Sequence, residues 1–288
     1  MQPSILDQKE KILNLIIEKL GNSSIDFSEK FESIKKKRKK NETWHAAGIL
    51  LIIHYKENPD AAVGNGGEFV FQLIKRSADV PQGGDLSCPG GMLELSKDRI
   101  LCNLISCGLP LILKGEALKH TQKRGKAAFR DISLFLANAL RESWEEVRLS
   151  PFNVTFLGPL PCYDLTLFTK TIFPVAGLVK KEINFHPNGE VDKIVEIPLK
   201  AFFREENYGI YSLEASDELD EVEERRWDFP CLIHQDHDGK EEILWGATFA
   251  IVTSFLKIVF DFELPHMKPK KVIKRILLPD YLTGNVSS

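Results

Sequence analysis

Hydrophobic residues recur along parts of the chain at the spacings typical of helices. Between residues 5 and 20 they fall near i, i+3, i+4 and i+7, and Gly21 follows as a helix-stop signal. We therefore predict an amphipathic helix over 5–20. The segments 131–147 and 246–260 have similar patterns and are also predicted to be helices.

Other apolar runs are short and rich in branched residues, which predicts strands. The run 46–54 contains Ile49-Leu50-Leu51-Ile52-Ile53 and should be buried on both faces. Further strands are expected at 69–75, 156–161, 171–180, 194–198, 229–234 and 242–245, the last two joined by a turn at Asp238-Gly239. Strands and helices follow one another irregularly, which favours an α/β sandwich of the α+β type over a doubly wound sheet.

Composition excludes several classes of protein. The 288 residues include 38 Lys+Arg and 41 Asp+Glu, a net charge of -3, and 43% are hydrophobic, which argues against a disordered or nucleic-acid-coating chain. The five cysteines lack zinc-ligand spacing, so we expect free thiols in a reducing cytosol. No apolar run reaches the roughly 18 residues of a membrane span, and no export signal is recognisable, so a soluble, cytoplasmic protein without a membrane partner is expected.

The run of six basic residues at 35–40 is interpreted as a solvated connector, with contact to phosphate or an anionic surface as the alternative. It lacks interleaved aromatic residues, so no nucleic-acid partner is expected. We predict an N-terminal helix and basic connector over 1–45, a main domain over 46–265 and a C-terminal tail over 266–288.

Three carboxylates in one predicted helix are the strongest chemical signal. At about 100° per residue, Glu145 and Glu146 lie about 60° and 40° to either side of Glu142, so the three share one face. Like charges at these spacings repel, and a divalent cation would turn the repulsion into a binding site. Oxygen ligands favour Mg²⁺ or Mn²⁺. Taken alone, the pattern is more typical of a solvated acidic face.

A glycine loop changes this balance. Gly90-Gly91-Met92-Leu93-Glu94, followed by Arg141-Glu142-Ser143-Trp144-Glu145-Glu146, resembles the signature of the Nudix hydrolases, in which a glycine loop precedes a helix of metal-binding carboxylates. The resemblance implies an α/β/α sandwich with a mixed β-sheet. It also implies a diphosphatase that holds Mg²⁺ or Mn²⁺ on its substrate while water attacks phosphorus.

The sequence departs from that signature in three ways. About 36 residues, at about 97–132, separate its two halves, and this insertion is interpreted as a lid or a homodimer surface. The acidic residue expected six positions after Gly91 is Lys97, with Asp98 one step further, and the glycine expected after the carboxylates is Arg148. On the helix face opposite Glu142, Trp144 is expected to pack into the core.

Several blocks outside the signature narrow the resemblance to the coenzyme A diphosphatases. They are 47–54, 71–77 with its Arg76-Ser77 pair, 160–161, 171–179, 185–191, 197–199 and 244–248. The segment 78–86 departs from that subgroup, since only Gly84-Asp85 resembles its pattern. This departure keeps ADP-ribose and other nucleoside diphosphates linked to a second group as alternative substrates.

The resemblance also implies roles for individual residues. Glu142, Glu145 and Glu146 would hold the metal, with Glu94 as a further candidate, and Glu145 would count among the catalytic residues. Glu190 would act as the catalytic base or a further ligand, and Arg141 would orient the loop. Arg76, Ser77, Gly90 and Gly91 would contact the substrate.

The sequence as a whole predicts a hydrolase that cleaves CoA or an acyl-CoA to 3′,5′-ADP and a phosphopantetheine product. The alternatives are hydrolysis of ADP-ribose or a related nucleoside diphosphate, and a catalytically silent Nudix-like binding or regulatory module. The silent module is suggested by Lys97 and Arg148, and the presence of Glu142, Glu145 and Glu146 argues against it.

Overall fold

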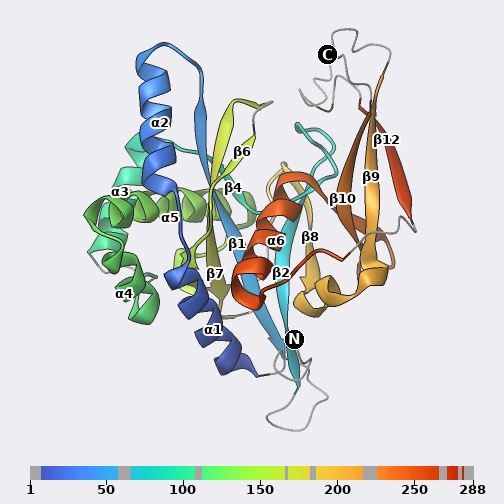
Figure 1. The fold of residues 1–288 in the computed structure, drawn as a ribbon, viewed down its shortest axis with the longest axis horizontal. Coiled ribbons are helices and arrows are strands. Elements are labelled where there is room, and N and C mark those ends of the chain that lie inside the picture. Colours follow the sequence, from blue (N-terminus) through green and yellow to red (C-terminus); the bar gives the residue numbers. More distant parts are fainter. Residues whose placement is uncertain are drawn as a thin grey trace.

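A mixed sheet organised around one long strand forms the centre of the fold (Figure 1). The computed structural model describes residues 8–57, 66–107, 112–165, 168–181, 186–216, 226–265, 271–277 and 281. Strand β1 (His45–Glu57) pairs antiparallel with β2 (Gly67–Arg76) and β4 (Gly90–Met92), and parallel with β7 (Lys170–Val179). The other strands of this sheet are β3 (Leu86–Ser87) and β8 (Val191–Pro198) beside β2, and β5 (Val154–Pro159) and β6 (Tyr163–Leu165) beside β7.

Both faces of the sheet are covered by helices (Figure 1). Helices α1 (Lys9–Asn22) and α6 (Gly246–Phe260) pack on one face, and α2 (Phe27–Lys39) and α5 (Lys126–Val147) pack on the other. Side chains alternate across β1, so that Leu51 joins the first layer and Leu50 the second, and both are fully buried. The α/β/α sandwich, its mixed sheet and the two-sided burial of 46–54 are thus confirmed.

A second sheet of four described strands lies beside this sandwich. Its order is β11-β10-β9-β12, where β9 is Tyr208–Ala215, β10 Arg226–Gln235, β11 Glu241–Leu244 and β12 Val272–Leu277. The predicted hairpin forms, and Gly239 has φ +78 in its turn. The sequence did not predict β9, and the segment interpreted as a C-terminal tail contributes β12, parallel to β9.

The described residues of the segment 97–132, which was expected to be an insertion, fold mainly as helices on the α5 side of the sheet. Helices α3 (Leu95–Ser106) and α4 (Gly115–Lys123) lead directly into α5, which begins at Lys126, earlier than predicted from its periodicity. The guanidinium of Arg124 donates to the carbonyl oxygens of Leu20, Gly21 and Ser23 at 2.7, 2.8 and 2.7 Å. It thereby caps the carboxyl end of α1, where helix carbonyls otherwise lack partners.

Some smaller expectations are corrected or confirmed. The basic run is not a connector, because residues 35–39 form the last turns of α2. Of the helix predicted over 5–20, residues 5–7 lie outside the described part of the chain. All five cysteines are free thiols, as expected. Among the described residues, no helix combines the length and the apolar character that crossing a bilayer requires. The described residues also include three short 3₁₀ helices, at Pro151–Asn153, Leu199–Phe203 and Glu205–Asn207.

Candidate active site

The glycine loop packs directly against β1 and the carboxylate helix. A Cβ atom on Gly90 would stand 2.4 Å from the carbonyl oxygen of Gly48, and one on Gly91 would stand 2.5 Å from the carboxyl carbon of Glu142. The Gly90 N–H donates to Oε2 of Glu146 at 2.9 Å. Both glycines are therefore required by close packing, and they bring the backbone to the carboxylates as the sequence predicted.

Asn138 fixes the helix over this loop. Its side-chain oxygen accepts a hydrogen bond from the Gly48 N–H at 2.6 Å, and its side-chain nitrogen donates to the carbonyl of Met92 at 3.1 Å. One buried amide thus joins α5 to both β1 and β4. Apart from its place in a predicted helix, nothing in the sequence singled out Asn138.

The three predicted metal ligands have different environments. Glu146 is only 5% exposed, the Glu142 side chain is 16% exposed, and the Glu145 side chain is 45% exposed. The buried face of α5 passes through Ser143 and Val147, and Glu145 lies about 200° from Ser143, on the open side.

Burial governs the protonation of the two inner carboxylates. It raises the pKa of Glu146 to about 8; the negative charge of Glu142 adds to this effect and the Gly90 N–H opposes it. Burial also raises the pKa of Glu142, against the opposing charge of Arg141. Two buried carboxylates near each other favour either a proton or a cation.

Arg141 connects the two halves of the signature. Its Nε donates to Oδ1 of Asp98 at 2.7 Å, and its terminal nitrogens lie 2.8 Å from Glu142 and 2.9 Å from Glu145. The same guanidinium donates to the Met92 carbonyl at 3.2 Å. Arg141 therefore orients the carboxylates and the loop, which supports the positioning role that the resemblance implied.

Asp98 occupies the acidic position that the sequence left open. Its side chain is fully buried against Arg141 and accepts a hydrogen bond from the Glu94 N–H at 2.7 Å. Lys97 points outward and pairs with the Glu94 carboxylate at 2.9 Å. The one-residue displacement is therefore accommodated at the start of α3. Glu94 is 44% exposed in these ion pairs.

Arg148 replaces the expected glycine and takes its conformation. It has φ 59 and ψ 28, in the left-handed region, and its N–H returns to the Trp144 carbonyl at 3.0 Å. The helix therefore ends in the left-handed conformation that glycine usually adopts there, and this conformation is strained for Arg148 because it has a Cβ atom. Trp144 was expected in the core but is 45% exposed, because it lies about 100° from the buried position of Ser143. Its ring lies 5.6 Å from the Arg148 guanidinium.

The loop of Glu190 meets the end of the carboxylate helix. The Asn188 N–H donates to the Glu146 carbonyl at 2.8 Å, and the Ser77 N–H donates to the Glu190 carbonyl at 2.8 Å. The negative charge of Glu190 contributes to the raised pKa of Glu146. The structure thus brings Glu190 and Ser77 to the site through backbone contacts.

Arg76 lines a cavity of about 360 Å³, and its charge also acts on Glu146. Its Nε donates to the Pro81 carbonyl at 2.9 Å, and its charge lowers the pKa of Glu146. The cavity lies between β3, the β6–β7 hairpin and the second sheet. The aromatic residues that line it are Tyr163, Phe168, Trp227, Phe229, Trp245 and Tyr281.

Asp85 holds the far wall of the cavity together. It accepts hydrogen bonds from Trp245 Nε1 at 3.2 Å, from Arg275 at 2.9 Å and from the Tyr281 hydroxyl. Burial raises the pKa of Asp85, and these three donors oppose the shift. A residue from the block that departs from the coenzyme A subgroup thus ties β12 and Tyr281 to the cavity.

The inner carboxylates fit a hard divalent cation. Glu142 and Glu146 offer only oxygen atoms, are largely buried, and repel each other electrostatically, which a cation would offset. In the described part of the chain, no group of three or more His, Cys, Asp or Glu side chains is arranged to hold a metal ion. Glu142 and Glu145 both pair with Arg141, so the metal-binding roles of Glu142, Glu145 and Glu146 stay predictions.

The chain matches known Nudix hydrolases in sequence, although no protein-family model matches it. It is 34% identical over 150 residues to an uncharacterized Nudix hydrolase, NudL, of Enterobacter sp. (strain 638), covering 48% of the chain and 70% of that relative. On this similarity, the chain belongs to the Nudix hydrolase family.

Two other relatives are covered less fully. NudL of Pectobacterium atrosepticum is 32% identical over 129 residues, which is 44% of the chain and 60% of that protein. The mitochondrial Nudix hydrolase 15 of Arabidopsis thaliana is 28% identical over 130 residues, 43% of the chain and 41% of that protein. The chain thus spans less than two thirds of either relative.

Solved structures resemble the chain only weakly. A Caenorhabditis elegans Ap4A hydrolase complex has 14% identity and a TM-score of 0.33, covering 54% of this chain and 81% of its own. The Mycobacterium smegmatis Nudix hydrolase RenU has 16% identity and a TM-score of 0.33, covering 55% and 76%. These values are too low to support a functional argument.

Proposed function

We propose that the protein is a metal-dependent diphosphatase that hydrolyses CoA or an acyl-CoA to 3′,5′-ADP and a phosphopantetheine product. The observation that carries the proposal is the pair of buried carboxylates, Glu142 and Glu146, packed against Gly90 and Gly91 and joined through Arg76 to an aromatic cavity. A diphosphate needs neutralised oxygens, and the organic group beside it needs an apolar site.

Glu142 and Glu146 are the residues that would hold Mg²⁺ or Mn²⁺, with Glu145 as a third ligand once its carboxylate leaves Arg141. Bound there, the cation would neutralise charge on the diphosphate oxygens and lower the pKa of a water. Arg141 keeps Glu142 in place through its 2.8 Å ion pair, while Asp98 fixes the guanidinium from behind.

Glu190 is proposed to accept the proton of the attacking water. Its loop is held at the end of α5 by the Asn188 and Ser77 backbone contacts, and its side chain is exposed to solvent. A carboxylate close to Glu146 is placed to act on a water at the same site. Arg76 binds substrate phosphate, since its terminal nitrogens have no carboxylate partner within hydrogen-bond range among the described residues.

The choice of CoA rests on the sequence blocks that resemble the coenzyme A diphosphatases. The Ser77 N–H donates to the Glu190 carbonyl and Arg76 lines the cavity, which supports the proposal that these two blocks act in substrate binding and catalysis. The segment 78–86, which departs from that subgroup except at Gly84-Asp85, supplies Gln82 to the cavity, so the alternative substrate, ADP-ribose or a related nucleoside diphosphate, remains the competing hypothesis.

The test is phosphate release after phosphatase coupling from CoA, acyl-CoA, ADP-ribose and NADH, with excess Mg²⁺ or Mn²⁺ and with EDTA. Metal-dependent cleavage of CoA is expected, and Glu146→Gln should reduce it by about 100-fold or more, whereas the exposed Glu205→Gln should not. Cleavage of ADP-ribose alone would overturn the CoA assignment. A folded protein inactive on every substrate would favour the silent module.

A further inference from the structure

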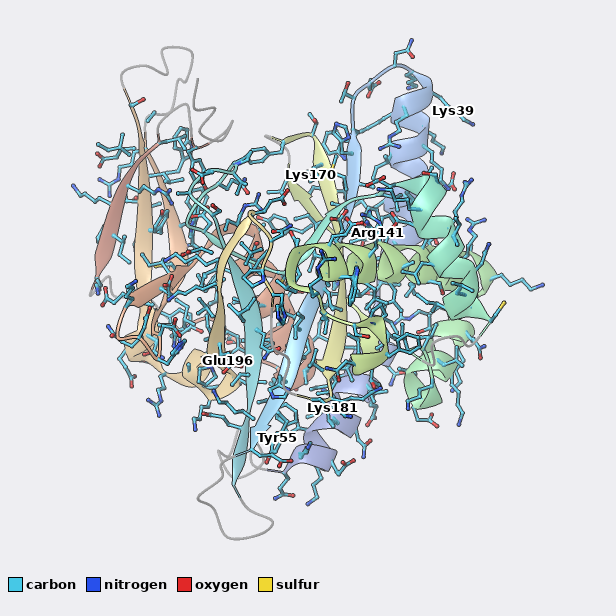
Figure 2. All side chains as sticks on the ribbon, turned by 180° about the vertical axis from the view of Figure 1, so that it is seen from behind. Lys39, Tyr55, Arg141, Lys170, Lys181 and Glu196 are labelled. Atoms are coloured by element: carbon cyan, nitrogen blue, oxygen red, sulfur yellow. The ribbon has the colours of Figure 1, made fainter. Side chains whose placement is uncertain are left out.

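Lys170 is a half-buried cation that no sequence motif singled out. It is the first residue of β7, paired with Leu165 in the β6–β7 hairpin and with His45 of β1. Figure 2 shows it in the same half of the molecule as Arg141, whereas Tyr55 and Lys181, near the other ends of β1 and β7, lie in the opposite half. Lys170 therefore belongs to the end of the sheet that carries the candidate site.

Lys170 differs from most other half-buried lysines because it lacks an acidic partner. Lys30, Lys75 and Lys193 form ion pairs with Asp164, Glu242 and Asp236 at 2.5, 2.9 and 2.6 Å. Among the described residues, no carboxylate lies within ion-pair distance of Lys170. Burial lowers its pKa, and the positive charge of Arg76 lowers it further. An unpaired, partly desolvated ammonium is costly unless something binds to it.

The second cation is Arg76, whose positive charge acts on both Lys170 and the carboxylate Glu146. Glu146 itself is not among the charges that act on Lys170. Among the described residues, the Arg76 side chain makes one hydrogen bond, from Nε to the Pro81 carbonyl, which leaves its terminal nitrogens for a ligand. Arg76 and Lys170 are close enough for their positive charges to act on each other, and a phosphate group bound by both would offset this repulsion.

The aromatic cavity is lined by Arg76 and bordered by the hairpin that carries Lys170. This hairpin contributes Tyr163, Leu165 and Phe168 to the cavity wall. We propose that Lys170 and Arg76 together bind a phosphate group of the substrate at the edge of this cavity, while the aromatic wall receives the adjoining base. The inference rests on the proposed function for its substrate class and names Lys170 as a binding residue.

The phosphate site proposed for Lys170 and Arg76 is tested by measuring nucleotide binding in the absence of metal and of turnover. Adenosine, ADP and 3′,5′-ADP are titrated calorimetrically in EDTA against the full chain, Lys170→Met, Lys170→Arg and the control Lys180→Met. Lys180 is an exposed lysine that follows the far end of β7, where its ammonium donates to the Phe152 carbonyl at 3.2 Å. Circular dichroism melting of each variant establishes that it is folded.

We expect the unmodified chain to bind ADP or 3′,5′-ADP more tightly than adenosine. Lys170→Met should remove about tenfold of that gain while leaving adenosine binding unchanged. Lys170→Arg should restore it and Lys180→Met should not reduce it. A loss confined to 3′,5′-ADP would assign the site to the 3′-phosphate, a loss confined to ADP would assign it to the β-phosphate, and a loss for both would assign it to the 5′-phosphate that the two ligands share.

Equal affinity of Lys170→Met and the unmodified chain for all three ligands would overturn the inference. No gain from phosphate in the unmodified chain would also overturn it. These outcomes are independent of hydrolysis, because no metal is present. A chain inactive on every diphosphate but with a Lys170-dependent gain would refute the proposed function and keep the phosphate site.

Discussion

Asp98 and Arg141 are 43 residues apart in the chain, yet Oδ1 of the first lies 2.7 Å from Nε of the second. Asp98 lies in the first turn of α3 and Arg141 lies in α5. The segment between them folds back so that these two helices pack side by side. Asp98 is fully buried and Arg141 is 11% exposed. The pair therefore closes the split signature through a contact in space.

Removing the acidic partner should destabilise the fold. Asp98→Asn leaves a buried guanidinium without its main counter-charge, and we expect a loss of about 3 kcal/mol in the free energy of unfolding. Urea denaturation measures this loss. The exposed Lys97→Met should change the same quantity by less than about 0.5 kcal/mol. The reverse order would mean that Lys97 occupies the acidic position of the signature.

Arg148→Gly should stabilise the protein. A glycine takes the left-handed conformation at φ 59 without a Cβ penalty, and the expected gain is about 1 kcal/mol. The melting temperature should rise by a few degrees, as measured by differential scanning calorimetry. Arg148→Ala is the matched control, since alanine retains the Cβ and should bring no such gain. Equal melting temperatures for the glycine and alanine variants would contradict a strained helix end.

Metal-free stability should fall as the pH rises from about 4.5 to about 8. The pKa of Glu146 is about 8 in the folded chain against 4.5 for an ordinary glutamate, so the folded state binds more protons than the unfolded state in this window. The loss is at most about 1.4 kcal/mol per pH unit. Urea titrations in EDTA measure it, and Glu146→Gln should flatten the profile. A flat profile in the unmodified chain would mean that Glu146 is not protonated there.

Glu190→Gln separates catalysis from binding. If Glu190 accepts a proton from water, kcat should fall by about 100-fold with little change in KM, because the backbone contacts of its loop remain. Steady-state kinetics on the preferred substrate provide the measurement. The exposed neighbour Asp192→Asn should have normal kinetics. Loss of activity in both variants would indicate a damaged loop, and full activity of Glu190→Gln would exclude it as the base.

Arg124→Met should loosen the contact between α1 and the insertion. Three charge-assisted hydrogen bonds to helix carbonyls are lost, and we expect about 2 kcal/mol of destabilisation. Hydrogen exchange should show the largest loss of protection at the end of α1. The adjacent exposed Lys123→Met is the control, with no comparable change. Unaltered exchange in α1 would show that the cap does not hold it.

The elements with a strong local pattern could be predicted from the sequence. The branched run of β1 and the periodicities of α5 and α6 depend on neighbours along the chain, and the carboxylates followed from their spacing. Strand β12 could not be predicted, because its partner β9 lies about 60 residues earlier and both have short, ambiguous patterns. The prediction that Trp144 is buried was wrong because the buried face of α5 is centred on Ser143. Only tertiary packing determines which face of the helix is buried.

The site itself was predictable only in part. Asp98 could be seen one position from its expected place, but its contact with Arg141 depends on the path of the insertion. Lys170 gave no signal, since a lysine at a strand end is ordinary until its burial and its lack of a carboxylate partner are known. Asn138 and Asp85 act through buried hydrogen bonds that join distant segments, and no spacing rule reports them.

The cap that Arg124 forms on α1 bears on how this chain could have arisen. A polypeptide inserted as a separate module could be cut out again, leaving the original domain intact. Here excision would leave the α1 carbonyls of Leu20 and Gly21 without the guanidinium that binds them. The N-terminal helix and the segment that carries Arg124 therefore stabilise each other, so that removing residues 97–132 would also weaken the end of α1.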